Sequence, residues 1–388
     1  MSPPALARFH SDLQHTRREF PQALTLPGAA YTSPEVYALE QRALFGRSWL
    51  CVGHVAQWPK PGDFSVLDIA GDSVLLLRAQ DGILRAHFNV CRHRGSKLVL
   101  ESAGHALTRM LCPYHAWSYQ ADGSLQQAPQ MPAGFCKEDH GLIPVRMEIF
   151  EGLVFVTLDE KAPPIDEHFR ELPDLSRYRM GELVPGGRIE YEVGANWKLV
   201  CENYSECYHC PGAHPQLARL TELIGRNERA QEIGNCFNGG PMRLRTGVQT
   251  MSHSGASPLR RIAGITDEDA RYVNYYVVYP NLLLSPHPDY VMTHLLWPIA
   301  PDRTKVVCDF FVTREARDAA NYDASDVIDF WDVTNRQDWL LCERVQAAAS
   351  SRGFRQGPYQ TSEDCVHTFD RWYAESMATL NGEAGRAP

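Results

Sequence analysis

Residues 89–98 read NVCRHRGSKL, and residues 112–119 read CPYHAWSY. Each stretch offers one cysteine and one histidine, and eighteen residues separate the two pairs. The four potential ligands are Cys91, His93, Cys112 and His115. The common zinc pattern places a pair of cysteines before a pair of histidines, so the order here is different. Two thiolates and two imidazoles in this order predict a metal or cluster site that is held by two loops.

This donor set suits a [2Fe-2S] cluster of the Rieske type. Two thiolates can hold one iron while two neutral imidazoles hold the other, and the imidazoles raise the reduction potential of the cluster. A structural zinc site, or core cysteines with incidental histidines, is the alternative for the same residues. Because four ligands in this order and spacing seldom coincide by chance, we interpret the two stretches as a Rieske cluster site.

The composition of the 388-residue chain is that of a globular protein of two or three domains. Its 47 acidic and 38 basic residues give a formal net charge of -9, which speaks against a nucleic-acid-binding or membrane-binding surface. The N-terminus lacks the apolar core of a secretory signal, and no stretch is long and apolar enough to cross a bilayer. We therefore expect a cytoplasmic protein whose 11 cysteines are reduced thiols or metal ligands rather than a disulfide framework.

The pattern along the chain predicts an α+β protein. Residues 1–45 are expected to form a helical segment, in which Ser33 caps a helix over 33–45. Short alternating strands over 46–160 predict a β-rich Rieske domain, and the proline-rich stretch 161–180 predicts a linker. Residues 181–380 mix strands with helices and are expected to form a catalytic domain with an antiparallel sheet. Its most convincing long helix spans residues 325–349.

A second group of potential metal ligands occurs at residues 196–215, which read NWKLVCENYSECYHCPGAHP. Glu206 and His209 lie three residues apart and would point the same way on the expected helix over 196–209. His209 and His214 would diverge on an unbroken helix, but a proline and a glycine between them can end it. The chain can then turn and bring both imidazoles to one metal. Two histidines and one carboxylate would leave three positions open on iron for O₂ and a substrate.

The third ligand is expected on the long helix 325–349. Its carboxylates include Asp326, Asp329, Asp332, Asp338 and Glu343. Asp338 shares a helical stripe with apolar residues such as Trp331 and Cys342, whereas Asp329 falls on the opposite side. A carboxylate on an apolar stripe is costly to bury unless it is paired or coordinated. We therefore predict Asp338 as the third ligand.

The two ligand groups together resemble the α subunits of Rieske non-haem iron oxygenases, the aromatic-ring-hydroxylating dioxygenase family, over residues 49–346. The segments that carry the resemblance are NVCRHRGS, CPYHAWSY, NWKLVCENYSECYHC and QDWLLCERVQ. The resemblance implies a helix-grip type of catalytic domain, an iron held by His209, His214 and Asp338, and a head-to-tail homotrimer. It also implies that Glu206 hydrogen-bonds a histidine ligand of the iron and reaches the neighbouring subunit's Rieske histidine, the equivalent of His115. Many family members have Asp at the position of Glu206, so the longer side chain is a departure that is shared by a subset including the carnitine oxygenases.

Within the family, the motifs look most similar to the branch of glycine betaine monooxygenase, stachydrine demethylase and choline monooxygenase. This implies an oxygenase component that uses O₂ and delivered electrons to hydroxylate or N-demethylate a small methylated ammonium compound such as a betaine. The alternative is an oxygenase that acts on an aromatic ring or a carboxylic acid. A third interpretation is a non-catalytic electron carrier or zinc protein. The predicted iron ligands His209, His214 and Asp338 argue against it.

The chain contains no glycine fingerprint for a dinucleotide. Electrons from NAD(P)H are therefore expected to arrive through a separate reductase that carries a flavin and an iron–sulfur centre. A quaternary ammonium group favours contact with aromatic faces. The aromatic residues near the expected site elements are Trp197, Tyr204, Tyr208, Tyr275, Tyr276 and Trp297. Each of them suits an ordinary core or surface position, so none is assigned to the substrate.

Overall fold

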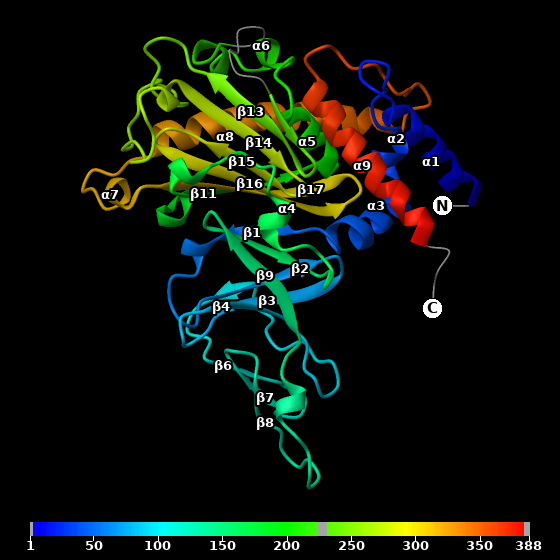
Figure 1. The fold of residues 1–388 in the computed structure, drawn as a ribbon, viewed down its shortest axis with the longest axis vertical. Coiled ribbons are helices and arrows are strands. Elements are labelled where there is room, and N and C mark those ends of the chain that lie inside the picture. Colours follow the sequence, from blue (N-terminus) through cyan, green and yellow to red (C-terminus); the bar gives the residue numbers. More distant parts are fainter. Residues whose placement is uncertain (1–2, 223–230, 384–388) are drawn as a thin grey trace. The chain divides into compact units, whose positions relative to one another are not determined.

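The computed structural model describes residues 3–222 and 231–383, and the chain divides into two compact units (Figure 1). One unit comprises residues 44–165, and the other comprises residues 1–43 together with 166–388. Among the described helices, none combines the length and the apolar character that crossing a membrane requires.

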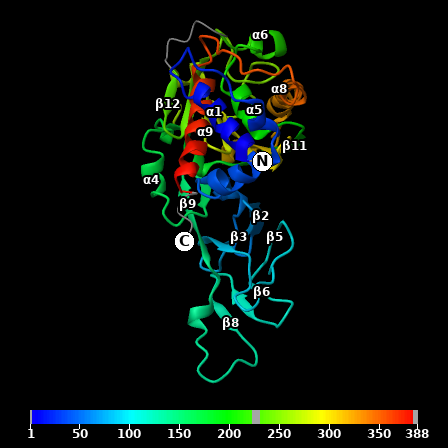
Figure 2. The same cartoon turned by 90° about the vertical axis from the view of Figure 1, so that its right-hand side faces the viewer.

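The unit of residues 44–165 is built mainly from antiparallel strands. A seven-stranded sheet has the order β1-β10-β9-β4-β3-β2-β5, and a three-stranded sheet has the order β6-β7-β8. In chain order the strands are β1 (Leu50–His54), β2 (Phe64–Ile69), β3 (Asp72–Arg78), β4 (Leu84–Phe88), β5 (Ala103–Gly104), β6 (Arg109–Leu111), β7 (Ser118–Gln120), β8 (Leu125–Gln127), β9 (Pro144–Phe150) and β10 (Leu153–Thr157). Figure 2 shows β6 and β8 of the small sheet below β2 and β3. The β-rich character predicted for this part of the chain is confirmed.

The core of this unit reaches from the large sheet to the small one. Apolar side chains of β3, such as Leu75 and Leu77, cluster with Trp117 and with Tyr119 on β7. Cys91 and Cys112 belong to the same buried cluster, although they lie in different loops. Hydrophobic burial therefore fixes the two cysteine loops to a common core.

The second unit contains a seven-stranded antiparallel sheet with the order β11-β17-β16-β15-β14-β13-β12. Its strands are β11 (Val184–Val193), β12 (Glu232–Gly234), β13 (Phe237–Arg243), β14 (Tyr272–Val278), β15 (Leu282–Pro286), β16 (Tyr290–Ala300) and β17 (Arg303–Val312). The long helix α8 (Ser325–Ala349) lies across one face of this sheet (Figure 1). Trp331 on the helix donates a hydrogen bond to Tyr290 on β16, and Tyr191 on β11 donates one to Asp332 on the helix.

The helices of this unit are α1 (Pro3–Thr16), α2 (Gly28–Thr32), α3 (Pro34–Glu40), α4 (Ile165–His168, which begins at the unit border), α5 (Trp197–Tyr204), α6 (Cys210–Ala213), α7 (Arg314–Arg317), α8 (Ser325–Ala349) and α9 (Asp364–Glu383). The structure confirms the helix that was predicted over 325–349. It also confirms Ser33 as a cap, since its side chain accepts a hydrogen bond from the N–H of Val36 at the start of α3.

The prediction of a helix over 196–209 is wrong at the C-terminal end of this segment. Helix α5 ends at Tyr204, and Ser205 forms its C-cap. The Glu206 carboxylate accepts hydrogen bonds from the N–H groups of Tyr208 and His209, which therefore make no helical hydrogen bonds. The proline after Cys210 stands in the first turn of α6 and does not end the preceding helix.

A buried ion pair ties α5 to two other helices. Lys198 on α5 and Glu40 on α3 have side chains that are 0% exposed, and 2.7 Å separates Nζ from Oε1. The Glu40 carboxylate also accepts hydrogen bonds from Trp197 Nε1 at 3.0 Å and from the Tyr373 hydroxyl on α9 at 2.6 Å. Both carboxylate oxygens of Glu40 are thus engaged, which fixes the helix that leads into the second ligand group.

Candidate active site

The predicted cluster ligands come together in the unit of residues 44–165. Cys91 follows β4 and Cys112 follows β6, and both thiols are buried. The ring centroids of His93 and His115 lie 4.6 Å apart, and the His93 ring stacks on Trp117 at 4.9 Å. His93 is exposed and His115 is half-buried. Two sulfur donors therefore face the core, and two imidazoles lie nearer the solvent.

Tight backbone turns shape both loops. The N–H of Gly95 donates to the carbonyl of Cys91 at 3.0 Å, and the N–H of Ala116 donates to the carbonyl of Cys112 at 3.1 Å. Gly95 has a φ of +76°, which glycine adopts without steric cost. These turns fold the backbone of each loop closely around the sulfur atom of its cysteine.

Polar groups surround both sulfur atoms. The Tyr119 hydroxyl lies 3.3 Å from Cys91 Sγ and accepts the N–H of Arg92 at 2.9 Å. Burial raises the pKa of the Cys91 thiol. Burial acts in the same sense on Cys112, but the N–H groups of Tyr114 and His115 outweigh it and lower the pKa of that thiol.

The residues present fit a [2Fe-2S] cluster. The donor set is two sulfurs and two imidazoles, and Nδ1 of His115 is buried without a hydrogen-bond partner among the described residues. A buried nitrogen without a partner is costly in a protein, and a metal bond removes that cost.

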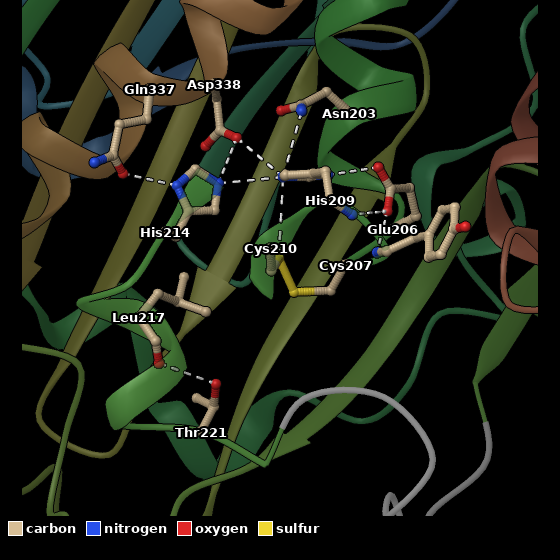
Figure 3. Close-up of a disulfide and its surroundings, with 11 residues drawn as sticks. Asn203, Glu206, Cys207, His209, Cys210, His214, Leu217, Thr221, Gln337 and Asp338 are labelled. Carbon is tan, nitrogen blue, oxygen red and sulfur yellow. Dashed lines mark hydrogen bonds and ion pairs between the residues drawn. A yellow bond between two sulfur atoms is a disulfide. The ribbon is translucent and has the colours of Figure 1, made fainter. Parts of the chain in front are cut away.

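The second ligand group converges in the other unit (Figure 3). His214 Nε2 lies 2.8 Å from Asp338 Oδ1, and His209 Nε2 lies 3.2 Å from the same oxygen. The two Nε2 atoms are 3.2 Å apart. The segment after α5 supplies the histidines and α8 supplies the aspartate, so the structure brings together the three residues that the sequence predicted.

The remaining ring nitrogens of both histidines are held by the chain. Glu206 Oε1 lies 2.5 Å from His209 Nδ1, and Gln337 Oε1 lies 2.8 Å from His214 Nδ1. Gln216 donates to the same Gln337 oxygen at 2.7 Å. These contacts leave Nε2 of each imidazole free to bind a metal, which is the usual arrangement around histidine ligands. Two nitrogens and one carboxylate oxygen that face a common point fit an iron ion with open positions.

The carboxylates of Glu206 and Asp338 govern the protonation of the two histidines. Burial alone would lower the pKa of His209, but hydrogen bonds to Asp338 and Glu206 raise it to about 9. Burial alone would raise the pKa of Asp338, but His209 and His214 lower it. The site is therefore one in which positive charge is stabilised.

A disulfide joins Cys207 and Cys210 beside this group, so the expectation of reduced thiols or metal ligands is wrong for these two cysteines (Figure 3). The Cys210 sulfur lies 3.9 Å from His209 Nε2 and could otherwise complete a metal-binding group with the two histidines. Because this sulfur is bonded to Cys207, it is no thiolate donor, and Asp338 is the better third ligand. The spacing C-Y-H-C was the available signal for this pair.

A pocket adjoins the three ligands and contains about 760 Å³ of empty space, its open mouth included. Its described lining includes Tyr204, Tyr275 and Trp331. Sequence reasoning assigned no aromatic residue to the substrate. Four of the six aromatic residues near the expected site elements do not line this pocket, namely Trp197, Tyr208, Tyr276 and Trp297. The acidic residues in the described lining are Glu206 and Asp338, and His209 contacts both of them. The aromatic faces are therefore the features of the pocket that suit a cation.

Family models match both parts of the chain. The model described as the Rieske [2Fe-2S] domain matches residues 48–148, and that described as the ring hydroxylating alpha subunit (catalytic domain) matches residues 180–379. The second match alone covers half of the chain.

Curated relatives match along most of their length. The glycine betaine monooxygenase oxygenase subunit of Chromohalobacter salexigens is 32% identical over 93% of this chain and 87% of its own length. The carnitine monooxygenase oxygenase subunit of Escherichia coli K12 is 29% identical over 86% of each chain.

Solved structures share the fold. The quaternary ammonium Rieske monooxygenase CntA in complex with L-carnitine superposes with a TM-score of 0.75 and 26% identity, covering 95% of this chain and 98% of its own. Naphthalene 1,2-dioxygenase from Rhodococcus sp. has a TM-score of 0.75 at 19% identity over 97% of this chain and 99% of its own, which shows likeness of fold. The chain, with its Rieske [2Fe-2S] and non-haem iron domains, belongs to the family of Rieske ring-hydroxylating oxygenase alpha subunits.

Proposed function

We propose that this protein is the oxygenase component of a Rieske system that N-demethylates a small quaternary ammonium compound. The convergence of His209, His214 and Asp338 beside an aromatic pocket carries the proposal. The relatives named for glycine betaine and carnitine support the same class of substrate.

Each predicted ligand then has a role. Cys91 and Cys112 would hold one iron of the cluster, and His93 and His115 would hold the other. His209, His214 and Asp338 would hold the mononuclear iron. When bound, the cluster would supply single electrons, and the mononuclear iron would supply the site for O₂ reduction beside the substrate. We assign the cluster domain to residues 46–160 and the catalytic domain to residues 181–380, with 161–180 as the linker and 1–45 as an N-terminal segment.

The reaction balances with two external electrons. An N-methyl group, O₂, two electrons and two protons give an N-hydroxymethyl group and water, and the hydroxymethyl group then leaves as formaldehyde. The electrons come from NAD(P)H through a separate reductase, and the reaction takes place in the cytoplasm. The chain's own contribution is to bind the ammonium group, because the faces of Tyr204 and Trp331 attract the cation.

Turnover assays with a surrogate reductase test this function. O₂ uptake and formaldehyde would be measured with glycine betaine, choline, carnitine, stachydrine and a set of aromatic acids. We expect uptake with matching formaldehyde for an ammonium compound. Uptake with an aromatic compound alone, giving a phenol or diol without formaldehyde, would contradict demethylation and favour ring hydroxylation.

We further propose that Glu206 is the bridge between subunits of a homotrimer. Its carboxylate holds Nδ1 of His209, and its reach would extend to the equivalent of His115 in the neighbouring subunit. The Glu206→Gln variant should keep both metal centres and slow turnover by about 100-fold, since outer partners of metal ligands typically contribute factors of 10 to 100. Rapid-mixing absorbance would follow reoxidation of the reduced cluster after O₂ and substrate are added.

The matched control for this variant is Glu182→Gln, which changes an exposed carboxylate that pairs with Arg179. It should react like the wild type. Normal cluster reoxidation in Glu206→Gln would exclude the bridging role.

A further inference from the structure

The Cys207–Cys210 disulfide lies directly beside the proposed iron ligands (Figure 3). Cys210 follows His209 in the chain, and its sulfur lies 3.9 Å from His209 Nε2. One donor atom from each of His209, Cys210 and His214 lies within 4.8 Å of the other two. The disulfide therefore engages a sulfur atom that lies within reach of a metal held by the two histidines.

Two separations in this group are close to those around a zinc ion. With Zn–S bonds of about 2.3 Å and Zn–N bonds of about 2.0 Å, a tetrahedral ion places sulfur and nitrogen about 3.6 Å apart and two nitrogens about 3.3 Å apart. The separation between Cys210 Sγ and His209 Nε2 is 3.9 Å, and the two histidine Nε2 atoms are 3.2 Å apart. Asp338 Oδ1 lies within 3.2 Å of both nitrogens and offers a fourth donor to the same site.

Backbone hydrogen bonds hold Cys210 in this place independently of the disulfide. Its carbonyl accepts the N–H of His214 at 2.9 Å, and its own N–H donates to the carbonyl of Cys207 at 3.3 Å. The N–H of Ala213 donates to the carbonyl of His209 at 3.1 Å, which closes the same turn. Cys210 is also buried. A reduced Cys210 would therefore remain beside the two histidines.

Both cysteines of the disulfide line the open pocket. Cys207 and Cys210 belong to its described lining, and Cys207 is half-buried. The pocket therefore gives a small thiol a route to the disulfide, which it can reduce by attack on a sulfur atom. Disulfides are rare in the cytoplasm, and those present are usually transient and redox-active. In a protein that we propose to be cytoplasmic, this disulfide is therefore expected to be reversible.

We propose that the Cys207–Cys210 disulfide is a redox switch of the metal specificity of this site. With the disulfide intact, two imidazoles and one carboxylate are the donors, a set typical of iron with open positions. With the disulfide reduced, the sulfur of Cys210 joins them, and a thiolate together with imidazoles favours Zn²⁺. The inference rests on the proposed assignment of the iron ligands, and it adds a second, zinc-binding state of the same site.

The change between the two states is a two-electron step. A dithiol supplies two electrons and two protons and itself becomes a disulfide. The bond between the sulfur atoms of Cys207 and Cys210 breaks, and two thiols form. When the Cys210 sulfur then binds the metal, its proton passes to the solvent.

Zinc binding by the holoprotein tests this switch. A chelator would first remove the mononuclear metal, and visible absorption would verify that the cluster is retained. Zn²⁺ would then be titrated into the disulfide form and into a form reduced with dithiothreitol and freed of it anaerobically. We expect reduction to lower the dissociation constant for Zn²⁺ at least about 10-fold, because a ligand is gained and even outer partners of ligands contribute about 10- to 100-fold. Zinc X-ray absorption should show a Zn–S distance of about 2.3 Å in the reduced form alone.

Two matched variants separate the effect of the thiolate from the loss of the cross-link. Cys207→Ser and Cys210→Ser both abolish the disulfide, so any general loosening of the segment is common to them. Cys207→Ser leaves the Cys210 thiol free, and it should bind Zn²⁺ tightly through sulfur even without dithiothreitol. Cys210→Ser should bind Zn²⁺ as the disulfide form does, with or without dithiothreitol.

Zn²⁺ bound through nitrogen and oxygen alone in every form, or an equal gain of affinity in both variants, would overturn the switch. A disulfide that cannot be formed, or that survives dithiothreitol in a thiol count, would also overturn it. A disulfide form that binds neither Fe²⁺ nor Zn²⁺ would instead overturn the proposed iron site. The two failures are distinguishable, because the switch alone fails when the disulfide form binds a metal and reduction changes neither its affinity nor its ligands.

Discussion

Replacing Asp338 by alanine should remove the mononuclear iron and leave the Rieske cluster intact. Asp338 Oδ1 lies within 3.2 Å of both histidine Nε2 atoms, so it is the atom on which the group converges. Loss of an outer partner typically weakens metal binding by about 10- to 100-fold, and loss of a ligand should exceed this. We expect less than about one tenth of the wild-type mononuclear iron and no measurable turnover.

Iron and sulfide analysis with visible absorption would check this result. The cluster absorption should be unchanged, because Cys91, His93, Cys112 and His115 belong to the other compact unit. Asp329→Ala is the control, since Asp329 lies on the same helix with an exposed side chain. Retention of full mononuclear iron in Asp338→Ala would contradict the assignment of this ligand.

Replacing Lys198 by methionine should be the most destabilising single change in the catalytic unit. Both members of the Lys198–Glu40 pair are 0% exposed, so the variant would leave the Glu40 carboxylate buried without its cation. Breaking a buried pair in this way typically costs about 3–5 kcal/mol of unfolding free energy. Denaturant titration followed by circular dichroism would measure the loss.

Two further variants serve as controls for this measurement. Lys305→Met removes an exposed pair with Glu190, whose side chains are 44% and 48% exposed, and should cost less than about 1 kcal/mol. The double variant Lys198→Met with Glu40→Leu removes both charges and should recover part of the loss. A single Lys198→Met variant as stable as Lys305→Met would contradict the structural role of the pair.

Local patterns explain why much of the fold could be predicted from the sequence. Helix α8 has buried residues at helical spacing over its whole length, so both of its ends were predicted correctly. The three residues of the second ligand group also came together as predicted, because an aspartate on an apolar stripe has few reasons to be there other than pairing or coordination.

Other features depend on contacts that sequence periodicity does not encode. The end of α5 at Tyr204 follows from the Glu206 side chain, which accepts the N–H groups of the next residues. Trp331 lines the pocket because α8 packs against the sheet. The same packing places Gln337 within hydrogen-bonding distance of His214. Such placements are set by tertiary packing and could not be predicted from spacing within one segment.

A single-turnover experiment tests most directly whether the two centres act together. Holoprotein with reduced cluster and ferrous iron would be freed of reductant and mixed with O₂ and the ammonium compound that supports turnover. The protein then stores the two electrons that one demethylation requires, so we expect about one formaldehyde per chain together with reoxidation of the cluster. Cluster reoxidation without formaldehyde, or formaldehyde while the cluster stays reduced, would contradict the account.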